Sequence, residues 1–264
     1  MLVEKDNAYF LHATPYRENS LLVYLLTQKH GKVSFIVTGV KSANRGKTPY
    51  HNKTALLQPC RPIIINYRLK NGLSKLSEIE PQAANQLPDI KYFMLYQYVN
   101  ELLLKLLPEQ FADAGIFTAY KKFLAILCQD YPYFALRLME LSLIDYFDGL
   151  TGLYQQETLR HHVDKTKNYY LHRATGIAEN PSNHSTATIS GQQLSAFNYL
   201  VALYQQHLTD KQQEHLADNV TADARETLAK AAQPISSFFI AGLLGDKPLN
   251  TRYIYRQLRH RKLL

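Results

Sequence analysis

Ten basic side chains lie in a stretch of this sequence that contains no acidic residue. The 59 residues between Glu18 and Glu78 hold no Asp or Glu, whereas the chain average of 22 acidic residues in 264 would place about five there. The cations are Lys29, Lys32, Lys41, Arg45, Lys47, Lys53, Arg61, Arg68, Lys70 and Lys75. Because they have no carboxylates nearby in the sequence, their natural counterion is an external polyanion, most commonly nucleic acid phosphate. The alternative is that they keep a β-rich segment soluble and protect its strand edges.

We expect these cations to form a surface that binds nucleic acid. Lys and Arg would set the affinity through counterion release, and aromatic side chains would offer faces on which unpaired bases stack. Tyr50 and His51 lie among the cations and have no evident place in a core, whereas Phe35 alternates with apolar neighbours and is interpreted as structural. No base-reading pattern is present, which favours contact with the nucleic acid backbone. The predicted contact residues are Arg17, Lys32, Lys41, Arg45, Lys47, Tyr50, His51, Lys53, Arg68, Lys70 and Lys75.

A segment from Gly39 to Thr48 ends in Gly-Lys-Thr, as a nucleotide-binding P-loop does. That motif requires a glycine where this chain has Lys41, and a helix should begin at its lysine. Pro49 instead keeps Thr48 out of helical geometry, so we do not expect ATP binding here.

Metal-dependent or nucleophilic catalysis has weak support in the sequence. His161 and His162 are adjacent, so on regular secondary structure their side chains diverge too far to share an ion easily. Cys60 and Cys128 are too few and too far apart for a zinc site or a disulfide framework, which suits a reducing compartment. We therefore expect a cytoplasmic protein that is not an enzyme, without metal or cofactor. The N-terminus lacks the pattern of a signal peptide, and no apolar run is long enough to span a membrane.

Arg137 is a second candidate for binding chemistry. On a helix, Phe134 and Leu141 flank it at three and four residues, so its guanidinium would stand beside an apolar surface and could hold a carboxylate. The alternative is a pair on the helix surface with Glu140, three residues on, and spacing alone favours that pair.

Five short strands are expected to carry the basic stretch. They are residues 9–14, 20–27, 32–38, 61–68 and 72–79, separated by glycine, proline and asparagine breaks. Five strands in about eighty residues predict a small closed barrel of the OB type, and an SH3-like barrel fits almost as well. The polar segment 41–54 is predicted to be a basic loop.

From Pro88 onward, apolar residues recur every three or four positions, as they do on one face of a helix. Because this helical region follows a β-rich one, we predict an α+β protein. The expected domains are an OB-type barrel in residues 1–80 and a mostly helical domain in 81–264, with an irregular subdomain at 151–189. Helices are predicted at residues 90–107, 111–127, 132–147 and 192–207, with Ser190 and Thr221 as caps and a break at Pro234. The C-terminal segment 250–264 is also helical in spacing. It carries Arg252, Arg256, Arg259, Arg261 and Lys262, whose part in nucleic acid binding the sequence leaves open.

Several segments of the chain resemble the RecO family of bacterial DNA repair proteins. The most specific is AYFLHATPYRENSLLVYLLT from Ala8, because a strand pattern alone would not place Pro15, Arg17, Glu18 and Ser20 together. The resemblance continues at GKVSFIVTGVK from Gly31, LQPCRP from Leu57, the stretches around Glu78 and Asn100, ALR from Ala135, and LGDKPLNTR from Leu244. It covers nearly the whole chain.

This resemblance implies a recombination mediator of the RecF pathway with an OB barrel and a helical remainder. Its implied partners are single- and double-stranded DNA, RecR and single-stranded DNA-binding protein (SSB), and its implied activity is annealing of complementary strands. Many family members carry four zinc-binding cysteines in the middle region. Residues 153–173 contain none, so we predict that zinc is absent.

The resemblance also bears on Arg137, which matches an Ala-Leu-Arg position of the family. It implies that Phe134, Arg137 and Leu141 receive the acidic, Phe-ending tail of SSB. The rival hypothesis is a scaffold for protein interactions with incidental DNA contact, and a hydrolase acting on nucleic acid would require metal-dependent cleavage.

Overall fold

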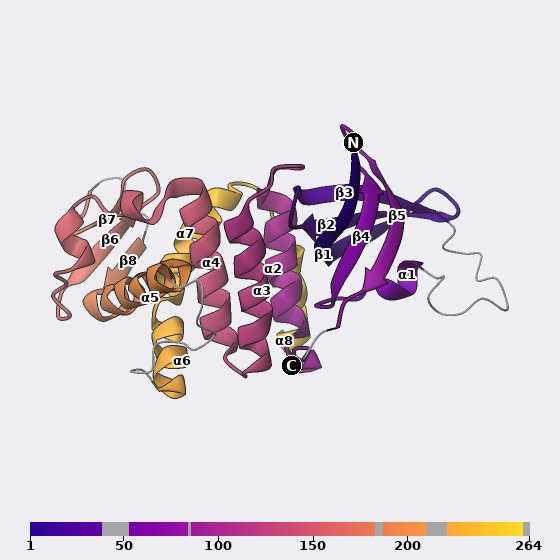
Figure 1. The fold of residues 1–264 in the computed structure, drawn as a ribbon. Coiled ribbons are helices and arrows are strands. Elements are labelled where there is room, and N and C mark those ends of the chain that lie inside the picture. Colours follow the sequence, from indigo (N-terminus) through magenta and orange to yellow (C-terminus); the bar gives the residue numbers. More distant parts are fainter. Residues whose placement is uncertain (39–52, 84–85, 183–186, 210–220, 261–264) are drawn as a thin grey trace. The chain divides into compact units, whose positions relative to one another are not determined.

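The computed structural model describes residues 1–38, 53–83, 86–182, 187–209 and 221–260 (Figure 1). The chain divides into two compact units, one formed by Met1–Thr118 with Pro248–Leu264 and the other by Ala119–Lys247. The first unit contains a five-stranded barrel, and the second is mostly helical with a small sheet. The predicted α+β class, an OB-type barrel followed by a helical region, is confirmed.

Four of the five barrel strands lie within two residues of their predicted bounds, whereas β1 extends further at both ends. They are β1 Leu2–Tyr16, β2 Ser20–Thr27, β3 Gly31–Thr38, β4 Pro62–Arg68 and β5 Ser74–Pro81. β1 pairs antiparallel with both β2 and β4, and β5 pairs antiparallel with β4 and parallel with β3. The sheet therefore closes on itself in the order β1-β2-β3-β5-β4.

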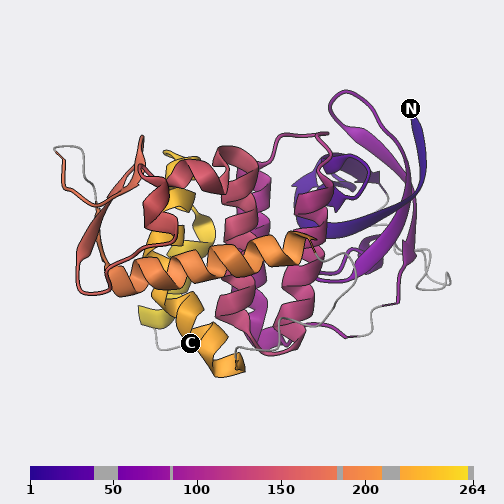
Figure 2. The same ribbon diagram turned by 60° about the vertical axis from the view of Figure 1, so that its left-hand side comes forward.

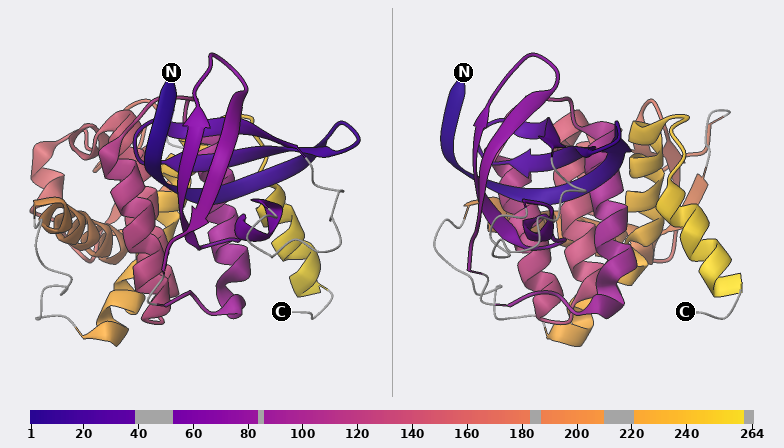
Figure 3. Two further views of the ribbon diagram at one scale, coloured as in Figure 1. Left: turned by 45° about the vertical axis from the view of Figure 1, so that its right-hand side comes forward. Right: turned by 90° about the vertical axis from the view of Figure 1, so that its right-hand side faces the viewer.

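Alternating side chains of all five strands fill the barrel. Val33, Phe35 and Val37 of β3 are buried there, which confirms the structural interpretation of Phe35. Helix α1 (Lys53–Leu56) lies against β5 (Figure 3). The side chain of Leu56 packs on the barrel core. The sequence did not predict α1, because four residues are too few to show a helical period.

The N-terminal half of β1 was also missed, since its charged residues Glu4, Lys5 and Asp6 are unfavourable in strands. Asp6 is nevertheless fully buried. The Tyr67 hydroxyl donates to its Oδ2 atom at 2.8 Å, and His30 Nδ1 lies 2.7 Å from that hydroxyl. Burial, with the hydrogen bond to Asp6, raises the pKa of Tyr67 far above its usual value. The network satisfies a buried carboxylate that would otherwise break the strand.

Two longer helices complete the first unit. A short 3₁₀ turn, η2 (Ile90–Tyr92), leads into α2 (Phe93–Leu106), whose Asn100 side chain donates to the Leu11 carbonyl of β1 at 3.0 Å. Helix α8 (Asn250–His260) lies beside α2. The Glu101 carboxylate of α2 accepts bonds from the backbone amides of Asn250 and Thr251, at 2.8 and 2.9 Å. Burial opposes the ionised form, yet these bonds hold the pKa of Glu101 below its usual value.

The second unit is built around α4. Its helices are α3 Ala114–Cys128, which begins in the first unit, α4 Pro132–Asp148, α5 Gly191–Thr209, α6 Ala222–Ala231 and α7 Gln233–Leu244, with 3₁₀ turns η3 Leu150–Leu153 and η4 Glu157–Arg160. Helices α5, α6 and α7 all pack against α4. The predicted caps are confirmed, since the Ser190 and Thr221 hydroxyls accept from the amides of Gln193 and Ala224.

The region predicted to be irregular contains a small sheet. Strands β6 Asn168–His172, β7 Gly176–Ala178 and β8 Ala187–Ser190 pair antiparallel in the order β7-β6-β8, beside α5 (Figure 2). His161 and His162 are exposed near its start. In the part of the chain that the structure describes, no three His, Cys, Asp or Glu side chains gather as a metal site would require, and no helix is long and apolar enough to cross a membrane.

Candidate nucleic acid interface

The end of β4 and the start of β5 bring two basic side chains face to face. In this antiparallel ladder Arg68 lies directly opposite Lys75, and both side chains are exposed. Their neighbours Tyr67 and Leu76 belong to the barrel core, so the alternation of the strands turns Arg68 and Lys75 outward. Lys70 is exposed in the turn between the strands. We call Arg68, Lys70 and Lys75 the hairpin cations.

None of the hairpin cations has an ion-pair partner among the described residues. Elsewhere, Lys105 pairs with Glu101 at 3.1 Å and Lys167 with Glu179 at 3.0 Å. Like charges directly opposite each other on neighbouring strands destabilise a sheet. A bound phosphate would relieve that repulsion, so this arrangement favours a polyanionic ligand.

A further exposed cation, Arg17, stands in the turn between β1 and β2. Its backbone has a φ of 55°, and its guanidinium lies 5.3 Å from the centre of the Tyr16 ring. Tyr16 pairs with Ser20, which pairs in turn with Thr38 at the end of β3. The turn therefore lies at the end of the barrel where the chain continues into residues 39–52.

Several predicted contact residues lie outside the described part of the chain. These are Lys41, Arg45, Lys47, Tyr50 and His51, together with the side chain of Lys53. The predicted basic loop at 41–54 lies there too, apart from its last residues, where α1 begins.

Lys32 requires a correction, because it is buried rather than available to a ligand. Only 7% of its surface is exposed, and its ammonium group donates to the Leu104 carbonyl of α2 at 2.7 Å. Its position on β3 could not reveal this, since the covering segment comes from residues more than seventy positions away. We therefore exclude Lys32 from the interface.

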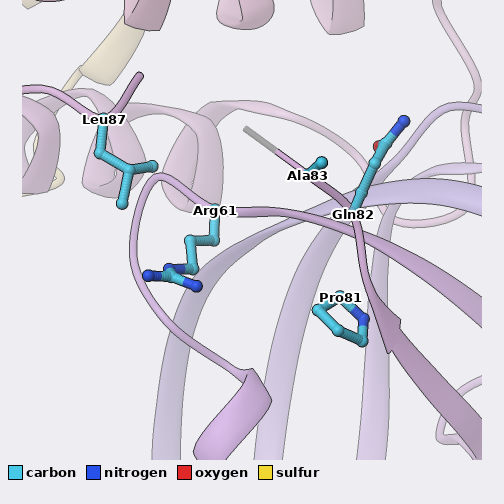
Figure 4. A pocket seen from close by; sticks show the side chains of 5 residues that line it. All are labelled: Arg61, Pro81, Gln82, Ala83 and Leu87. Atoms are coloured by element: carbon cyan, nitrogen blue, oxygen red, sulfur yellow. The ribbon is translucent and has the colours of Figure 1, made fainter. Parts of the chain in front are cut away.

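A shallow hollow of about 370 Å³ lies beside the start of β4 and the end of β5 (Figure 4). Its lining residues are Arg61, Pro81, Gln82, Ala83 and Leu87. Arg61 is exposed and, like the hairpin cations, forms no ion pair among the described residues. It belongs to the acid-free stretch, but its spacing did not distinguish it as a contact. Cations therefore flank both ends of β4.

The three residues predicted to receive an SSB tail lie inside the second unit. Phe134 and Leu141 are fully buried, and Arg137 is 4% exposed. Arg137 Nη1 lies 2.6 Å from Glu140 Oε2, so these side chains form a buried ion pair rather than the surface pair considered from the sequence. The Nε atom of Arg137 has no hydrogen-bond partner among the described residues. Within the described part of the chain, Arg137 therefore exposes too little surface to receive a peptide carboxylate.

The start of α4 is also occupied by an acidic side chain of its own unit. The Glu226 carboxylate of α6 accepts from the backbone amides of Tyr133 and Phe134 at 3.2 and 3.4 Å. Burial raises the pKa of Glu226 above its usual value, although these bonds oppose the shift. The positive end of the helix dipole is thus compensated internally.

The C-terminal arginines are only partly described. Arg252 is half-buried, with its guanidinium 5.7 Å from the centre of the Tyr98 ring. The side chains of Arg256 and Arg259, and residues Arg261 and Lys262 altogether, lie outside the described part.

Comparison with known proteins identifies the family. Residues 1–84 match the family model "Recombination protein O N terminal". A "DNA repair protein RecO" of Psychromonas ingrahamii is 30% identical over 257 residues, covering 97% of this chain and 99% of that protein. Proteins of the same name are 27% identical in Haemophilus influenzae strain Rd, over 97% of this chain and 98% of theirs, and 24% identical in Alteromonas mediterranea, over 94% and 95%. The chain therefore belongs to the RecO family of DNA repair and recombination proteins.

Proposed function

We propose that the protein is a recombination mediator of the RecF pathway that binds single- and double-stranded DNA, anneals complementary strands and acts with RecR on SSB-coated DNA. The observation that carries this proposal is the set of exposed hairpin cations on the barrel of a RecO family member, which form no ion pair among the described residues. Such a role places it at the bacterial nucleoid, in the cytoplasm.

The positions of the cations on the barrel support this assignment. OB barrels bind oligonucleotides through the loops that join strands 1 and 2 and strands 4 and 5. Arg17 stands in the first of these loops and Lys70 in the second. Because these side chains contact phosphates rather than base edges, we expect little dependence of affinity on sequence.

Annealing requires no covalent step, so we propose binding rather than catalysis as the activity. Two DNA strands repel each other through their phosphates, and cations that displace condensed counterions lower that repulsion. Complementary bases can then pair. We propose SSB and RecR as partners without assigning either a surface, because Phe134, Arg137 and Leu141 are buried.

The proposal is tested by removing the hairpin cations together. In the triple variant Arg68→Ala/Lys70→Ala/Lys75→Ala, we expect the affinity for single-stranded DNA, measured by fluorescence anisotropy, to fall at least tenfold at low salt. The slope of log affinity against log salt should shrink by about 0.7 for each lost phosphate contact, or roughly 2 in total.

The matched control removes three exposed cations of the second unit, in Lys121→Ala/Lys165→Ala/Arg173→Ala. It lowers the net charge equally and should change the slope by much less. If the two triple variants bind and anneal DNA alike, net charge rather than this site governs binding. If both variants bind and anneal DNA as well as the wild type does, DNA contact is incidental, and this result favours the hypothesis of a scaffold for protein interactions.

A further inference from the structure

The segment that joins α2 to α3 lies along one edge of the barrel. Glu109 forms a parallel bridge with Lys32 of β3, and the Gln110 amide donates to the Lys32 carbonyl at 2.8 Å. The Ser34 hydroxyl donates to the Glu109 carboxylate at 3.0 Å. Gly31 is required for this approach, because a Cβ there would come 2.0 Å from the Phe111 carbonyl oxygen.

The barrel needs this segment because β3 and β5 pair over a short distance. Their parallel contact involves only Phe35 with Ser74 and Ile36 with Lys75. Residues 31–34 of β3 therefore have no partner in β5, and unpaired backbone groups at a strand edge are costly when water is excluded. Glu109 and Gln110 supply the missing partner.

Gln110 also reaches across to the turn between β4 and β5. Its Nε2 atom donates to the Lys70 carbonyl at 2.5 Å and lies 3.3 Å from the Gly72 carbonyl. Its backbone has a φ of 58°, in the left-handed region that Gln rarely adopts. One residue thus bonds β3 through its backbone and the hairpin turn through its side chain.

We propose that Gln110 is a positioning residue for DNA binding, which holds the β4–β5 turn so that Lys70 lies in line with Arg68 and Lys75. This inference rests on the proposed function. A turn released from Gln110 samples more conformations, and Lys70 then loses entropy when it binds a phosphate. Gln110 itself contacts no DNA in this proposal.

The test is Gln110→Asn, which separates the side-chain contact from backbone strain. Asn adopts a positive φ more readily than Gln, so the backbone bond to Lys32 is kept. The shorter amide cannot reach the Lys70 carbonyl. We expect the affinity for single-stranded DNA to fall about threefold to tenfold, the cost of ordering one flexible side chain on binding, with the melting temperature within about 2 °C of the wild type. Amide hydrogen exchange should become faster in residues 69–74 and nowhere else.

Gln58→Asn is the matched control, because the side-chain amide of Gln58 donates to the Ala55 carbonyl of its own segment. It should leave affinity unchanged. A comparison of combined variants decides the mechanism. When Gln110→Asn is added to the triple variant of the hairpin cations, it should cause no further loss of DNA affinity. A loss that simply adds to that of the triple variant would overturn the positioning role.

The remaining outcomes separate this inference from the proposed function. If the triple variant is weak but Gln110→Asn binds as the wild type does, the positioning role alone fails. If the triple variant itself binds normally, the proposed function fails. Should Gln110→Asn lower the melting temperature strongly and accelerate exchange throughout the barrel, Gln110 is a general structural residue and the inference is wrong.

Discussion

Arg68 on the barrel and Arg137 in α4 carry the same charged group in opposite surroundings. Arg68 is exposed, faces a second cation and has no acidic partner among the described residues, whereas Arg137 is 4% exposed and lies 2.6 Å from Glu140. A buried charge must be paired inside the protein, while an exposed one remains available to an external anion. We therefore expect Arg137 to have a structural role and Arg68 to have a binding role.

The largest expected effect is on stability, from Arg137→Ala. This change removes the cation that lies 2.6 Å from the buried Glu140 carboxylate, and it should lower the free energy of unfolding by about 3–5 kcal/mol, measured by urea denaturation. Arg160→Ala, which breaks the more exposed pair with Glu157, should cost less than about 1 kcal/mol. If Arg137→Ala instead abolishes binding of an SSB-tail peptide with little loss of stability, Arg137 is a ligand-binding residue and the comparison fails.

A smaller effect, with opposite signs for stability and affinity, is expected from Lys75→Glu. The new carboxylate would pair with Arg68 across the strands and stabilise the fold by about 0.2–1 kcal/mol. DNA affinity should nevertheless fall about tenfold at low salt, because one phosphate-binding cation is replaced by an anion. Lys75→Gln should lie between the wild type and Lys75→Glu both in stability and in DNA affinity. Unchanged affinity in Lys75→Glu would show that this ladder does not face DNA.

The smallest effect should come from Glu226→Gln at the start of α4. The amide oxygen can still accept from Tyr133 and Phe134, but it carries no charge. Burial raises the pKa of Glu226 in the folded protein above its pKa in the unfolded chain. The stability that this shift contributes is therefore fully present below the unfolded-state pKa, and it is lost as the pH rises through the folded-state pKa. The variant should be more stable relative to the wild type at pH 7 than it is at pH 4, in paired denaturation curves. A larger relative gain at pH 4 would contradict the burial argument.

The sequence predicted the strands of the barrel well because apolar alternation and turn residues are local signals. It placed β2 with the observed bounds and β3 and β4 within one residue, and it identified the caps at Ser190 and Thr221. It could not extend β1 through Asp6, because the hydrogen bond that makes burial tolerable comes from Tyr67, sixty-one residues away.

The same limit explains why the sequence did not reveal which candidate residues are buried. Helical spacing correctly grouped Phe134, Arg137 and Leu141, but spacing does not reveal how many neighbouring helices cover a face. Lys32 looked like any other cation of the acid-free stretch, although Leu104 accepts from it. Gln110 carried no signal at all, since its role depends on two carbonyls forty residues earlier in the chain.

The Glu101 carboxylate, which holds the first turn of α8 against α2, has a consequence for synthesis on the ribosome. The first unit takes its last helix from the far end of the chain, whereas all residues of the second unit precede it. The barrel and α2 therefore emerge first, but Glu101 gains the amide donors of Asn250 and Thr251 only after Ala119–Lys247 has been translated. Nascent chains of which residues 1–247 have left the ribosome should thus hold a complete second unit and a first unit that still lacks α8.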